Sequence, residues 1–398
     1  MGGYRKDNSC FKFLIMLSEK EISRYSRHLL LPEIGNEGQA KLKGSRVLVI
    51  GAGGLGCPVL MYLAAAGVGK IGIVDFDIVD ETNLQRQILF DAADIGSSKS
   101  EIAKQKLSKQ NPLIEIESIQ QKLTNQNALD IFSGYDIIVD GTDNFSTRYL
   151  VSDACVLLGK TLVSGSIFKF QGQISVFNFK NANGEFGPTY RCLFPTPPPP
   201  GSMTSCSEAG VLGVLPGITG TLMATEVIKI IVGIGEVLSG KLLMMDALTM
   251  NFQTIQIERN TEAIRSAPQN EKEFKKTDYD HFCGIEEKNF VAKEISAREL
   301  FEMISSKANF QLLDVREPNE QPVVSELNGL KIPLGEIEQH AEKISRDKKV
   351  IVICRSGNRS KKAIEVLSKK FDFKNLYNLR GGVAAWLQTI PEKQKVLL

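Results

Sequence analysis

The chain has 398 residues, which at about 150 residues per domain predicts two or three domains. Hydrophobic residues make up 42% and charged residues 24%, proportions typical of soluble globular proteins that exclude collagen-like, disordered and coiled-coil chains. Lys and Arg number 48 against 46 Asp and Glu, so the formal net charge is +2, too small for a general field that attracts nucleic acid or an anionic membrane. Partners must therefore be recognised at local sites.

The most apolar stretch and the cysteines indicate where in the cell the protein is located. Residues 211–235 are interrupted by Pro216 and carry Glu226 and Lys229, which predicts a core helix and not a membrane anchor. The cysteines are odd in number and scattered, unlike the dense disulfide framework of a small secreted domain, and this favours a reducing, cytoplasmic location. They are Cys10, Cys57, Cys155, Cys192, Cys206, Cys283 and Cys354.

From Arg46 onward strands alternate with helical segments, which predicts an α/β domain with a mostly parallel sheet over residues 17–257. Residues 1–16 precede it as an N-terminal extension, with Met16 as an alternative start of translation. Residues 258–289 are polar with little apolar periodicity and predict a linker. Residues 290–394 then predict a second, smaller α/β domain. The expected strands of the first domain are Val47–Ile50, Ile71–Asp75, Ile114–Ile119, Ile137–Asp140, Thr161–Ser164, Ile174–Phe177 and Leu242–Asp246.

A glycine-rich loop follows the first expected strand. Small residues there let the backbone approach a phosphate, and the N-terminus of the following helix supplies N–H donors and positive potential. Asp75 ends the next strand, where a carboxylate accepts hydrogen bonds from ribose hydroxyls. The loop alone does not separate an NAD-dependent oxidoreductase from an enzyme that uses ATP. Its glycines are Gly51, Gly53, Gly54 and Gly56.

Charged residues after this loop favour a metal-bound triphosphate over a hydride carrier. Arg86 lies in the run Asn83–Gln87, Lys99 follows it, and Asp143 comes just after the strand that ends at Asp140. Cations and a carboxylate suit nucleotidyl transfer, which depends on neutralising the charge on phosphate oxygens. The alternative is that the cations are ordinary surface charges and the aspartate caps a helix.

Residues 20–257 resemble the MoeB/ThiF family of adenylyltransferases, relatives of ubiquitin-activating enzymes. The resemblance implies a Rossmann-like doubly wound sheet in a homodimer. It also implies that ATP and Mg are used to activate the C-terminal Gly-Gly of a ubiquitin-like sulfur carrier as an acyl-adenylate, with release of pyrophosphate. The motifs that carry it are Arg24-Tyr-Ser-Arg27, Gly51–Gly56, Asp75-Phe-Asp77, Asn83–Gln87, Gly141-Thr-Asp-Asn144 and Tyr190-Arg-Cys192.

The family pattern assigns roles to the matching residues of the nucleotide site. Gly54 would face the phosphates, and Asp75 would bind the ribose. Asn83 would assist at the phosphates, while Arg86 and Lys99 would stabilise the α-phosphate and the leaving pyrophosphate.

Two further residues extend this assignment. Asp143 would hold the magnesium ion. Arg27 would lie in the nucleotide site of the partner subunit, which is why a homodimer is expected; the alternative is an ordinary charge on an N-terminal helix.

Members of the family usually carry two Cys-x-x-Cys pairs that bind a structural zinc ion. Here the first pair reads Thr189 to Cys192 and the second Asp280 to Cys283, so half of each pair is missing. Besides the two cysteines, either Asp280 or His281 could still bind a metal ion. Structural zinc sites, however, need four good ligands. Zinc is therefore not expected.

Cys206 ends a proline-rich segment and matches a family cysteine that attacks the activated or sulfurated carrier. A thiolate there would be favoured by a helix N-terminus. The alternative is a small apolar filler.

A second thiol centre opens after the expected strand Val350–Ile353. Cys354 begins a loop that would aim consecutive N–H groups, together with Arg355 and Arg359, at one sulfur, which favours a thiolate or a persulfide. A cysteine-dependent phosphatase would have its arginine at the place of Ser360, so the loop favours sulfur over phosphate. The loop reads Cys354, Arg355, Ser356, Gly357, Asn358 and Arg359.

With Asp314–Glu317 upstream and Arg380–Trp386 downstream, residues 290–394 resemble a rhodanese, whose cysteine carries sulfane sulfur as a persulfide. The segment Glu317–Asn328 departs from the pattern, because it lacks the usual Gly-His-Ile step.

Together the two resemblances imply an adenylyltransferase and sulfurtransferase. The expected partner is a carrier of MoaD type in molybdopterin biosynthesis, with a ThiS-type carrier in thiazole biosynthesis as the alternative. The sulfur donor would be thiosulfate or a cysteine desulfurase that bears a persulfide. A non-catalytic scaffold that binds nucleotide and carrier is the alternative of a different class.

Overall fold

The computed structural model describes residues 16–198, 210–284 and 292–390, which belong to two compact units divided after residue 287. Cys206 and most of the proline-rich segment lie outside the described residues.

The first unit contains an eight-stranded sheet in the order β3-β2-β1-β4-β5-β6-β7-β8. The first five strands of that order are parallel, and β6, β7 and β8 are antiparallel to their neighbours. Every expected strand is present, and β8 is an additional edge strand whose exposed residues carry no continuous apolar run. The strands are β1 Arg46–Ile50, β2 Lys70–Val74, β3 Glu115–Ile119, β4 Ile137–Asp140, β5 Thr161–Phe168, β6 Gln171–Phe177, β7 Lys241–Asp246 and β8 Asn251–Gln256.

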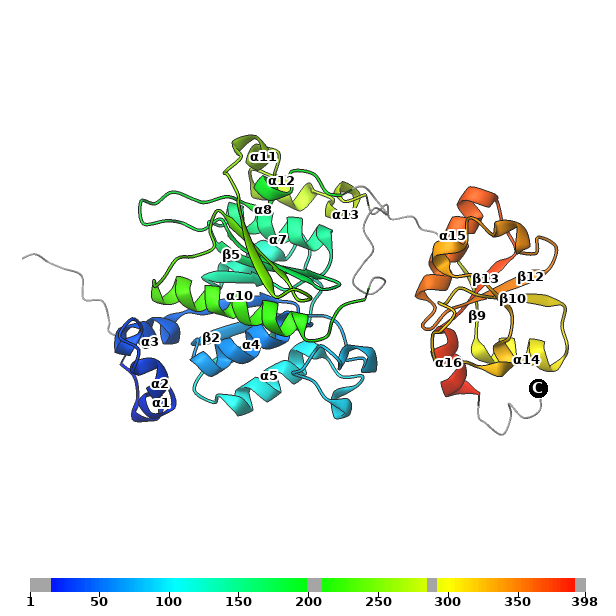
Figure 1. Ribbon diagram of the computed structural model, residues 1–398, viewed down its shortest axis with the longest axis horizontal. Coiled ribbons are helices and arrows are strands. Elements are labelled where there is room, and N and C mark those ends of the chain that lie inside the picture. Colours follow the sequence, from blue (N-terminus) through cyan, green and yellow to red (C-terminus); the bar gives the residue numbers. More distant parts are fainter. Residues whose placement is uncertain (1–15, 199–209, 285–291, 391–398) are drawn as a thin grey trace, which may run out of the picture. The chain divides into compact units, whose positions relative to one another are not determined.

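Helices cover both faces of this sheet, as the doubly wound fold predicts (Figure 1). One buried core lies under α4, α5 and α10, and a second lies under α6, α7 and the short helices α12 and α13. The helices are α1 Glu19–Arg24, α2 Ser26–Leu29, α3 Gly35–Gly44, α4 Gly56–Ala66, α5 Lys99–Gln110, α6 Ala128–Ser133, α7 Phe145–Leu157, α8 Tyr190–Leu193, α10 Leu215–Val232, α11 Thr261–Arg265, α12 Glu271–Lys276 and α13 Tyr279–Phe282.

Helix α10 is the described helix that is long and apolar enough to cross a membrane by length and composition. It packs against α4 and against strands β5 and β6, and its residues Met223 and Val227 belong to the first core. Glu226 on the same helix is buried and accepts a hydrogen bond from the backbone N–H of Leu238 at 2.9 Å. The predicted core helix is therefore present.

The prediction of a linker over residues 258–289 is wrong for residues 258–284. This segment forms α11, α12 and α13 and packs on the first unit. Phe274 is fully buried and Tyr279 nearly so, and both belong to the core beside α7. A few apolar anchors among many charges are enough to dock the segment, but they leave no periodic pattern in the sequence.

The second unit is a five-stranded parallel sheet in the order β11-β10-β12-β13-β9. Its strands are β9 Lys293–Ile295, β10 Phe310–Asp314, β11 Leu330–Lys331, β12 Lys349–Ile353 and β13 Leu376–Leu379. Its helices are α14 Ala297–Ser305, α15 Asn358–Phe371 and α16 Gly382–Thr389. Between β11 and β12 the chain forms two short 3₁₀ turns, at Leu334–Glu336 and Ala341–Lys343.

Candidate functional site

A pocket of about 410 Å³ opens at the carboxyl ends of the parallel strands in the first unit. Its walls are the segments that follow β1, β2, β3 and β4. The chain runs from β1 outward to β3 and then returns to β4 on the other side of β1, so the pocket lies where the strand order reverses. Ligands of open α/β sheets bind at this switch point.

The glycine loop forms the base of the pocket. Gly51 has a φ of +89°, which favours glycine, and it turns the chain sharply from β1. Gly53 and Gly54 line the pocket, whereas Gly56 does not and begins α4. At the start of this helix the N–H groups of Cys57 and Val59 donate to the carbonyl oxygens of Gly53 and Leu55, so an anion would be met by N–H groups of the glycine loop before them.

The glycines at 53 and 56 should respond differently to substitution. A Cβ on Gly56 would lie 1.8 Å from the carbonyl oxygen of Gly51, whereas a Cβ on Gly53 would meet only the Gln87 side chain at 3.8 Å. We expect Gly56→Ala to lower the melting temperature strongly or to prevent folding, because backbone would have to move. Gly53→Ala should fold normally and bind ATP more weakly, since its methyl group occupies the pocket. Thermal melts and equilibrium binding of ATP separate the two, and equal melting temperatures would contradict this account.

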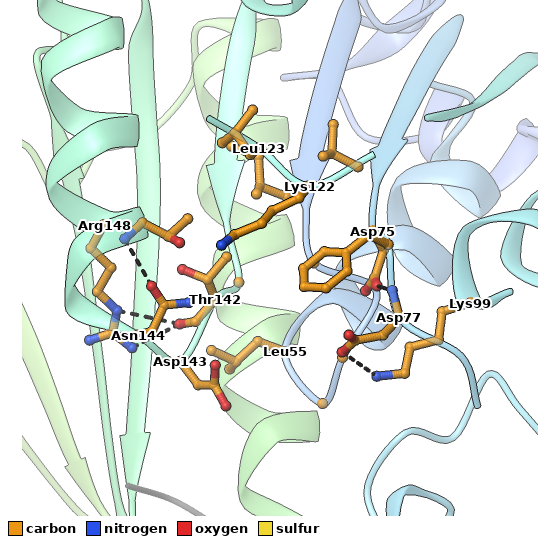
Figure 2. Close-up of a pocket in the computed structure, with 18 of the residues that line it drawn as sticks. Leu55, Asp75, Asp77, Lys99, Lys122, Leu123, Thr142, Asp143, Asn144 and Arg148 are labelled. Atoms are coloured by element: carbon orange, nitrogen blue, oxygen red, sulfur yellow. Dashed lines mark hydrogen bonds and ion pairs between the residues drawn. The ribbon is translucent and has the colours of Figure 1, made fainter. Parts of the chain in front are cut away.

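Asp75 is held rigidly beside the glycine loop. One carboxylate oxygen accepts the backbone N–H of Ala52 at 2.7 Å, and the other accepts that of Asp77 at 2.8 Å. Burial raises the pKa of Asp75, while these hydrogen bonds and the charge of Lys99 oppose the rise. The oriented carboxylate keeps lone pairs that can accept hydrogen bonds from a ligand's hydroxyl groups. Figure 2 shows it at the rim of the pocket with Asp77 and Lys99 beside it.

The predicted cations reach the same pocket. The Lys99 ammonium is nearly buried and lies 3.1 Å from a carboxylate oxygen of Asp77, so it is not aimed at open solvent. Arg86 lies beside Gly54, where a Cβ would be 3.7 Å from its Cγ, and its guanidinium donates to the carbonyl of Thr82. An anion in the pocket would meet both positive charges.

Asn83 does not line the pocket, although the resemblance gave it a role at the phosphates. It ends a 3₁₀ turn, and its backbone carbonyl accepts the N–H groups of Arg86 and Gln87 at 3.0 and 2.9 Å. In this structure its contribution is to fix the turn that presents Arg86.

Asp143 lies on the wall opposite Asp75 and Asp77 (Figure 2). The next residue, Asn144, is the one that caps α7, since its side chain accepts the N–H of Thr147 at 2.9 Å. Asp143 is therefore not the residue that caps the helix, which was the alternative to a role in the site. A single carboxylate suits Mg²⁺, which takes most of its ligands from water and substrate phosphates. In the described parts of the chain, no group of three or more His, Cys, Asp or Glu side chains could hold a metal ion without such help.

The structure adds residues that the sequence did not identify. Lys122, an exposed residue after β3, extends across the pocket mouth in Figure 2. Arg148 lines the pocket and donates to the carbonyl of Thr142 at 2.9 Å. Asp280, considered above as a metal ligand, instead lines the pocket from α13. These residues come together through tertiary folding, and no local motif marks them.

Arg27 is exposed on α2 and does not line the pocket of its own chain. A role for this residue at a nucleotide site would therefore require a second chain.

The residues at the lost Cys-x-x-Cys positions do not fit a structural zinc ion. The Cys192 sulfur accepts backbone N–H groups from Thr189 and Asn260, both at 3.3 Å. Cys283 is buried, and burial raises the pKa of its thiol to about 11. A structural zinc site needs four good ligands, and no group of three or more His, Cys, Asp or Glu side chains suited to a metal is found among the described residues.

These two segments are instead linked through a buried ion pair whose carboxylate belongs to α7. The Arg191 guanidinium on α8 makes two hydrogen bonds to the Asp153 carboxylate on α7, at 2.9 and 2.8 Å. Tyr279 on α13 donates its hydroxyl to the same carboxylate at 3.0 Å. The rings of Tyr149 and Phe282 lie against the guanidinium. This cluster fastens α13 to α7 and α8 without a metal.

We expect Arg191→Met to lower the free energy of unfolding by about 3–5 kcal/mol, because the Asp153 carboxylate would remain buried without its partner. Arg46→Met is the control: its pair with Asp136 is exposed, so the loss should stay below about 1 kcal/mol. Denaturant unfolding measures both. The chelator EDTA should leave the melting temperature of the unaltered protein unchanged. If EDTA lowers the melting temperature, or if the two variants lose the same free energy of unfolding, the cluster around Arg191 is not what holds α13 in place without a metal.

The loop after β12 forms the second thiol site. Cys354 is fully buried at the end of the strand, and its sulfur accepts the backbone N–H of Gly357 at 3.1 Å. Gly357 has a φ of +91°, a conformation that favours glycine, and α15 begins directly after it. The turn thus presents the sulfur to the N-terminal end of the helix.

The two arginines of this loop are placed differently, and the charge of Arg359 interacts with Cys354. Arg355 is exposed, and Arg359 makes two ion-pairing hydrogen bonds to Glu320, one of them at 2.7 Å. Glu320 belongs to the segment that departs from the rhodanese pattern, and Arg316 also binds this segment by donating to the carbonyl of Pro322 at 2.8 Å. The charge of Arg359 is therefore paired with Glu320 beside the site.

Both units match known protein families. The sequence pattern of the ThiF family matches residues 25–265, and that of the rhodanese-like domain matches residues 296–389. The chain is 46% identical over 376 residues to a probable adenylyltransferase/sulfurtransferase MoeZ of Mycobacterium tuberculosis, covering 93% of this chain and 94% of the relative.

Two other relatives are also similar. A sulfur carrier protein adenylyltransferase of Thermus thermophilus is 49% identical over 269 residues, which are 67% of this chain and 98% of that protein. The adenylyltransferase and sulfurtransferase MOCS3 of Drosophila grimshawi is 40% identical over 390 residues, which are 94% of this chain and 86% of that protein.

Among solved structures, the first unit resembles Escherichia coli MccB. The complex of MccB with MccA-N7isoASN has a TM-score of 0.53 and 25% identity, and the match covers 60% of this chain and 72% of that chain. MccB with ATP has a TM-score of 0.52 at 24% identity, with 61% of this chain and 73% of that chain covered, and supports the fold assignment.

Proposed function

The chain belongs to the ThiF family and carries a rhodanese-like domain, and from this premise we propose that it is an ATP-dependent adenylyltransferase and sulfurtransferase acting on a ubiquitin-like sulfur carrier. The relatives that match nearly its whole length are named for both activities. The observation that carries the proposal is the pocket at the strand reversal, where Arg86, Lys99 and Asp143 meet around the glycine loop.

In the first step the carrier's terminal carboxylate attacks the α-phosphorus of ATP, and pyrophosphate leaves. Asp75 would accept hydrogen bonds from the ribose, and the N–H groups at Gly53 and Gly54 would contact phosphate oxygens. Arg86 and Lys99 would neutralise charge that builds on those oxygens. Asp143 would hold Mg²⁺, which when bound supplies further neutralisation of the phosphates.

In the second step sulfur reaches the activated carrier. Thiosulfate or the persulfide of a cysteine desulfurase would first load Cys354 with sulfane sulfur. The terminal sulfur of the Cys354 persulfide attacks the acyl carbon, the bond to AMP breaks, and an acyl disulfide forms. A second thiol, for which Cys206 is the candidate, attacks the Cys354 sulfur and releases the carrier thiocarboxylate. The disulfide left on the enzyme is then reduced by an external thiol.

We assign the carrier to the MoaD type and the pathway to molybdopterin biosynthesis, with a ThiS-type carrier as the alternative. The proline-rich sequence before Cys206 supports this assignment. The position of Arg27, exposed and away from its own pocket, supports a homodimer in which each subunit completes the other's site. The free thiols of Cys57, Cys155, Cys192, Cys283 and Cys354 support a cytoplasmic location.

ATP–pyrophosphate exchange by the full chain tests the proposal, with MoaD-type and ThiS-type carriers and with each carrier lacking its last glycine as control. Exchange that depends on the intact MoaD-type carrier is the expected result. Exchange with the ThiS-type carrier alone would move the protein to the thiazole pathway. If no carrier supports exchange while thiosulfate still loads Cys354, the first unit is a scaffold.

A further inference from the structure

Asp280 on α13 is a carboxylate of the nucleotide pocket that the fold itself does not use. Its side chain is partly buried and lines the pocket. Asp278, two residues earlier, caps α13 by accepting the backbone N–H of His281 at 2.9 Å. In the part of the chain that the structure describes, no hydrogen bond or ion pair engages the Asp280 carboxylate. Its oxygens are therefore available as acceptors for a ligand.

An adjoining hollow of about 290 Å³ shows at which end of the pocket Asp280 lies. The two cavities share five lining residues, which are Lys122, Leu123, Ser146, Thr147 and Asp280. Figure 2 shows Lys122 and Leu123 on the side of the pocket away from Asp143. Asp280 therefore belongs to the end that is formed by the segment after β3 and the start of α7, and not to the end formed by the glycine loop.

The proposed orientation of the nucleotide brings its base to this end. The phosphates would meet the glycine loop and Arg86, and the ribose would meet Asp75, whose carboxylate is fixed by two backbone N–H groups. The base extends from the ribose away from the phosphates. The side chains of Val74 and Leu123 line the pocket there and are nearly buried, so they offer apolar contact to a flat ring.

The polar edge of an adenine ring restricts which of its atoms Asp280 can contact. The 6-amino group of adenine donates hydrogen bonds, whereas the ring nitrogens N1 and N7 accept them. Of the two charged side chains that the cavities share, Lys122 can only donate and an ionised Asp280 can only accept. The 6-amino group is therefore the part of the base that suits Asp280.

The neighbours of Asp280 in α13 hold this helix in place. Tyr279 is buried and donates its hydroxyl to the Asp153 carboxylate at 3.0 Å. The ring of Phe282 lies against the Arg191 guanidinium, 4.7 Å from ring centre to the central carbon. Because these contacts fix the helix before any ligand binds, the Asp280 carboxylate is presented to the pocket at little cost in entropy.

We propose that Asp280 accepts a hydrogen bond from the exocyclic amino group of the nucleotide base and thereby selects a 6-aminopurine. The inference rests on the proposed use of ATP by the first unit. It gives a binding role to a residue at one of the lost Cys-x-x-Cys positions, where no metal has to be held.

Equilibrium binding of two nucleotides to the full-length protein tests the proposal. ATP is compared with purine riboside triphosphate, which carries a hydrogen in place of the 6-amino group, both as Mg²⁺ complexes. The unaltered protein should bind ATP about tenfold more tightly, the typical effect of one hydrogen bond to a charged acceptor. In Asp280→Ala the two nucleotides should bind equally, because ATP loses affinity and the analogue does not.

Asp278→Asn is the matched control. It removes a carboxylate from the same helix, lies outside the nucleotide pocket, and keeps the helix cap because asparagine caps as well as aspartate. This variant should keep the full preference for ATP. An unchanged preference in Asp280→Ala, or an equal loss of preference in Asp278→Asn, would overturn the proposal.

Asp280→Asn provides a second variant in case Asp280→Ala does not fold. The amide oxygen still accepts a hydrogen bond but carries no charge, so the preference for ATP should shrink while the affinity for the analogue stays the same. Weaker binding of both nucleotides by the same factor would contradict a contact with the amino group.

These binding measurements need neither a carrier nor catalysis. A preference that depends on Asp280, in a protein that supports no ATP–pyrophosphate exchange, would refute the proposed function and leave the role of Asp280 intact. A preference that Asp280→Ala leaves unchanged, in an enzyme that adenylylates a carrier, would do the reverse.

Discussion

An Arg86→Ala variant is expected to lose ATP–pyrophosphate exchange by a factor of about 100 to 1,000, the loss typical when one group that stabilises transition-state charge is removed. Arg86 lies against the glycine loop, and its guanidinium is held by Thr82 at the edge of the pocket. Lys99 cannot replace it, because its ammonium lies at another part of the pocket wall, beside Asp77. Exchange rates at saturating ATP and carrier measure the effect.

The control for this prediction is Arg46→Ala. Arg46 begins β1, at the end of the strand opposite the glycine loop, and pairs with Asp136 on the surface. Its loss should leave exchange unchanged. Thiosulfate sulfurtransferase activity should also persist in Arg86→Ala, because Arg86 and Cys354 belong to different compact units. Comparable losses of exchange in the two variants would mean that Arg86 acts through stability and not at the phosphates.

A Cys354→Ser variant is expected to lose transfer of sulfane sulfur to the carrier below the limit of detection while retaining ATP–pyrophosphate exchange. The sulfur of Cys354 is the one that its loop presents to the start of α15, and a serine hydroxyl cannot form a persulfide. The acyl-adenylate should accumulate, since its formation needs only the first unit. Mass spectrometry of the carrier follows both species.

Cys192→Ser is the matched control, because Cys192 is a thiol in the first unit held by hydrogen bonds from Thr189 and Asn260. This variant should transfer sulfur at the normal rate. Residual transfer by Cys354→Ser that is lost in a variant of another cysteine would relocate the sulfur-carrying thiol.

The parts of the fold that the sequence predicted are those set by local chemistry. Continuous apolar runs gave the parallel strands, because strands buried on both faces need no polar alternation. The glycine loop could be located because only small residues fit the tight turn after the first strand. Asp75 could be located because the ribose-binding carboxylate lies at the end of the next strand. The segment 258–284 could not be predicted, because its docking depends on isolated anchors such as Phe274.

The site residues that were missed or misjudged depend on contacts between distant segments. Arg359 also pairs with Glu320, which lies 39 residues upstream, and no spacing rule connects the two residues. Lys122 and Asp280 reach the pocket from the segment after β3 and from α13, which the fold alone brings together. The buried pair of Arg191 and Asp153 likewise joins two helices that are separated in sequence.

The central claim is that one chain adenylylates a carrier and then converts it to a thiocarboxylate through Cys354. It is tested most directly by intact-mass analysis of a MoaD-type carrier after incubation with the enzyme, ATP, Mg²⁺, thiosulfate and a thiol reductant. The account predicts the mass change for replacement of one carboxylate oxygen by sulfur, dependent on both ATP and Cys354. A thiocarboxylate that forms without ATP, or equally well with the Cys354→Ser variant, would contradict it.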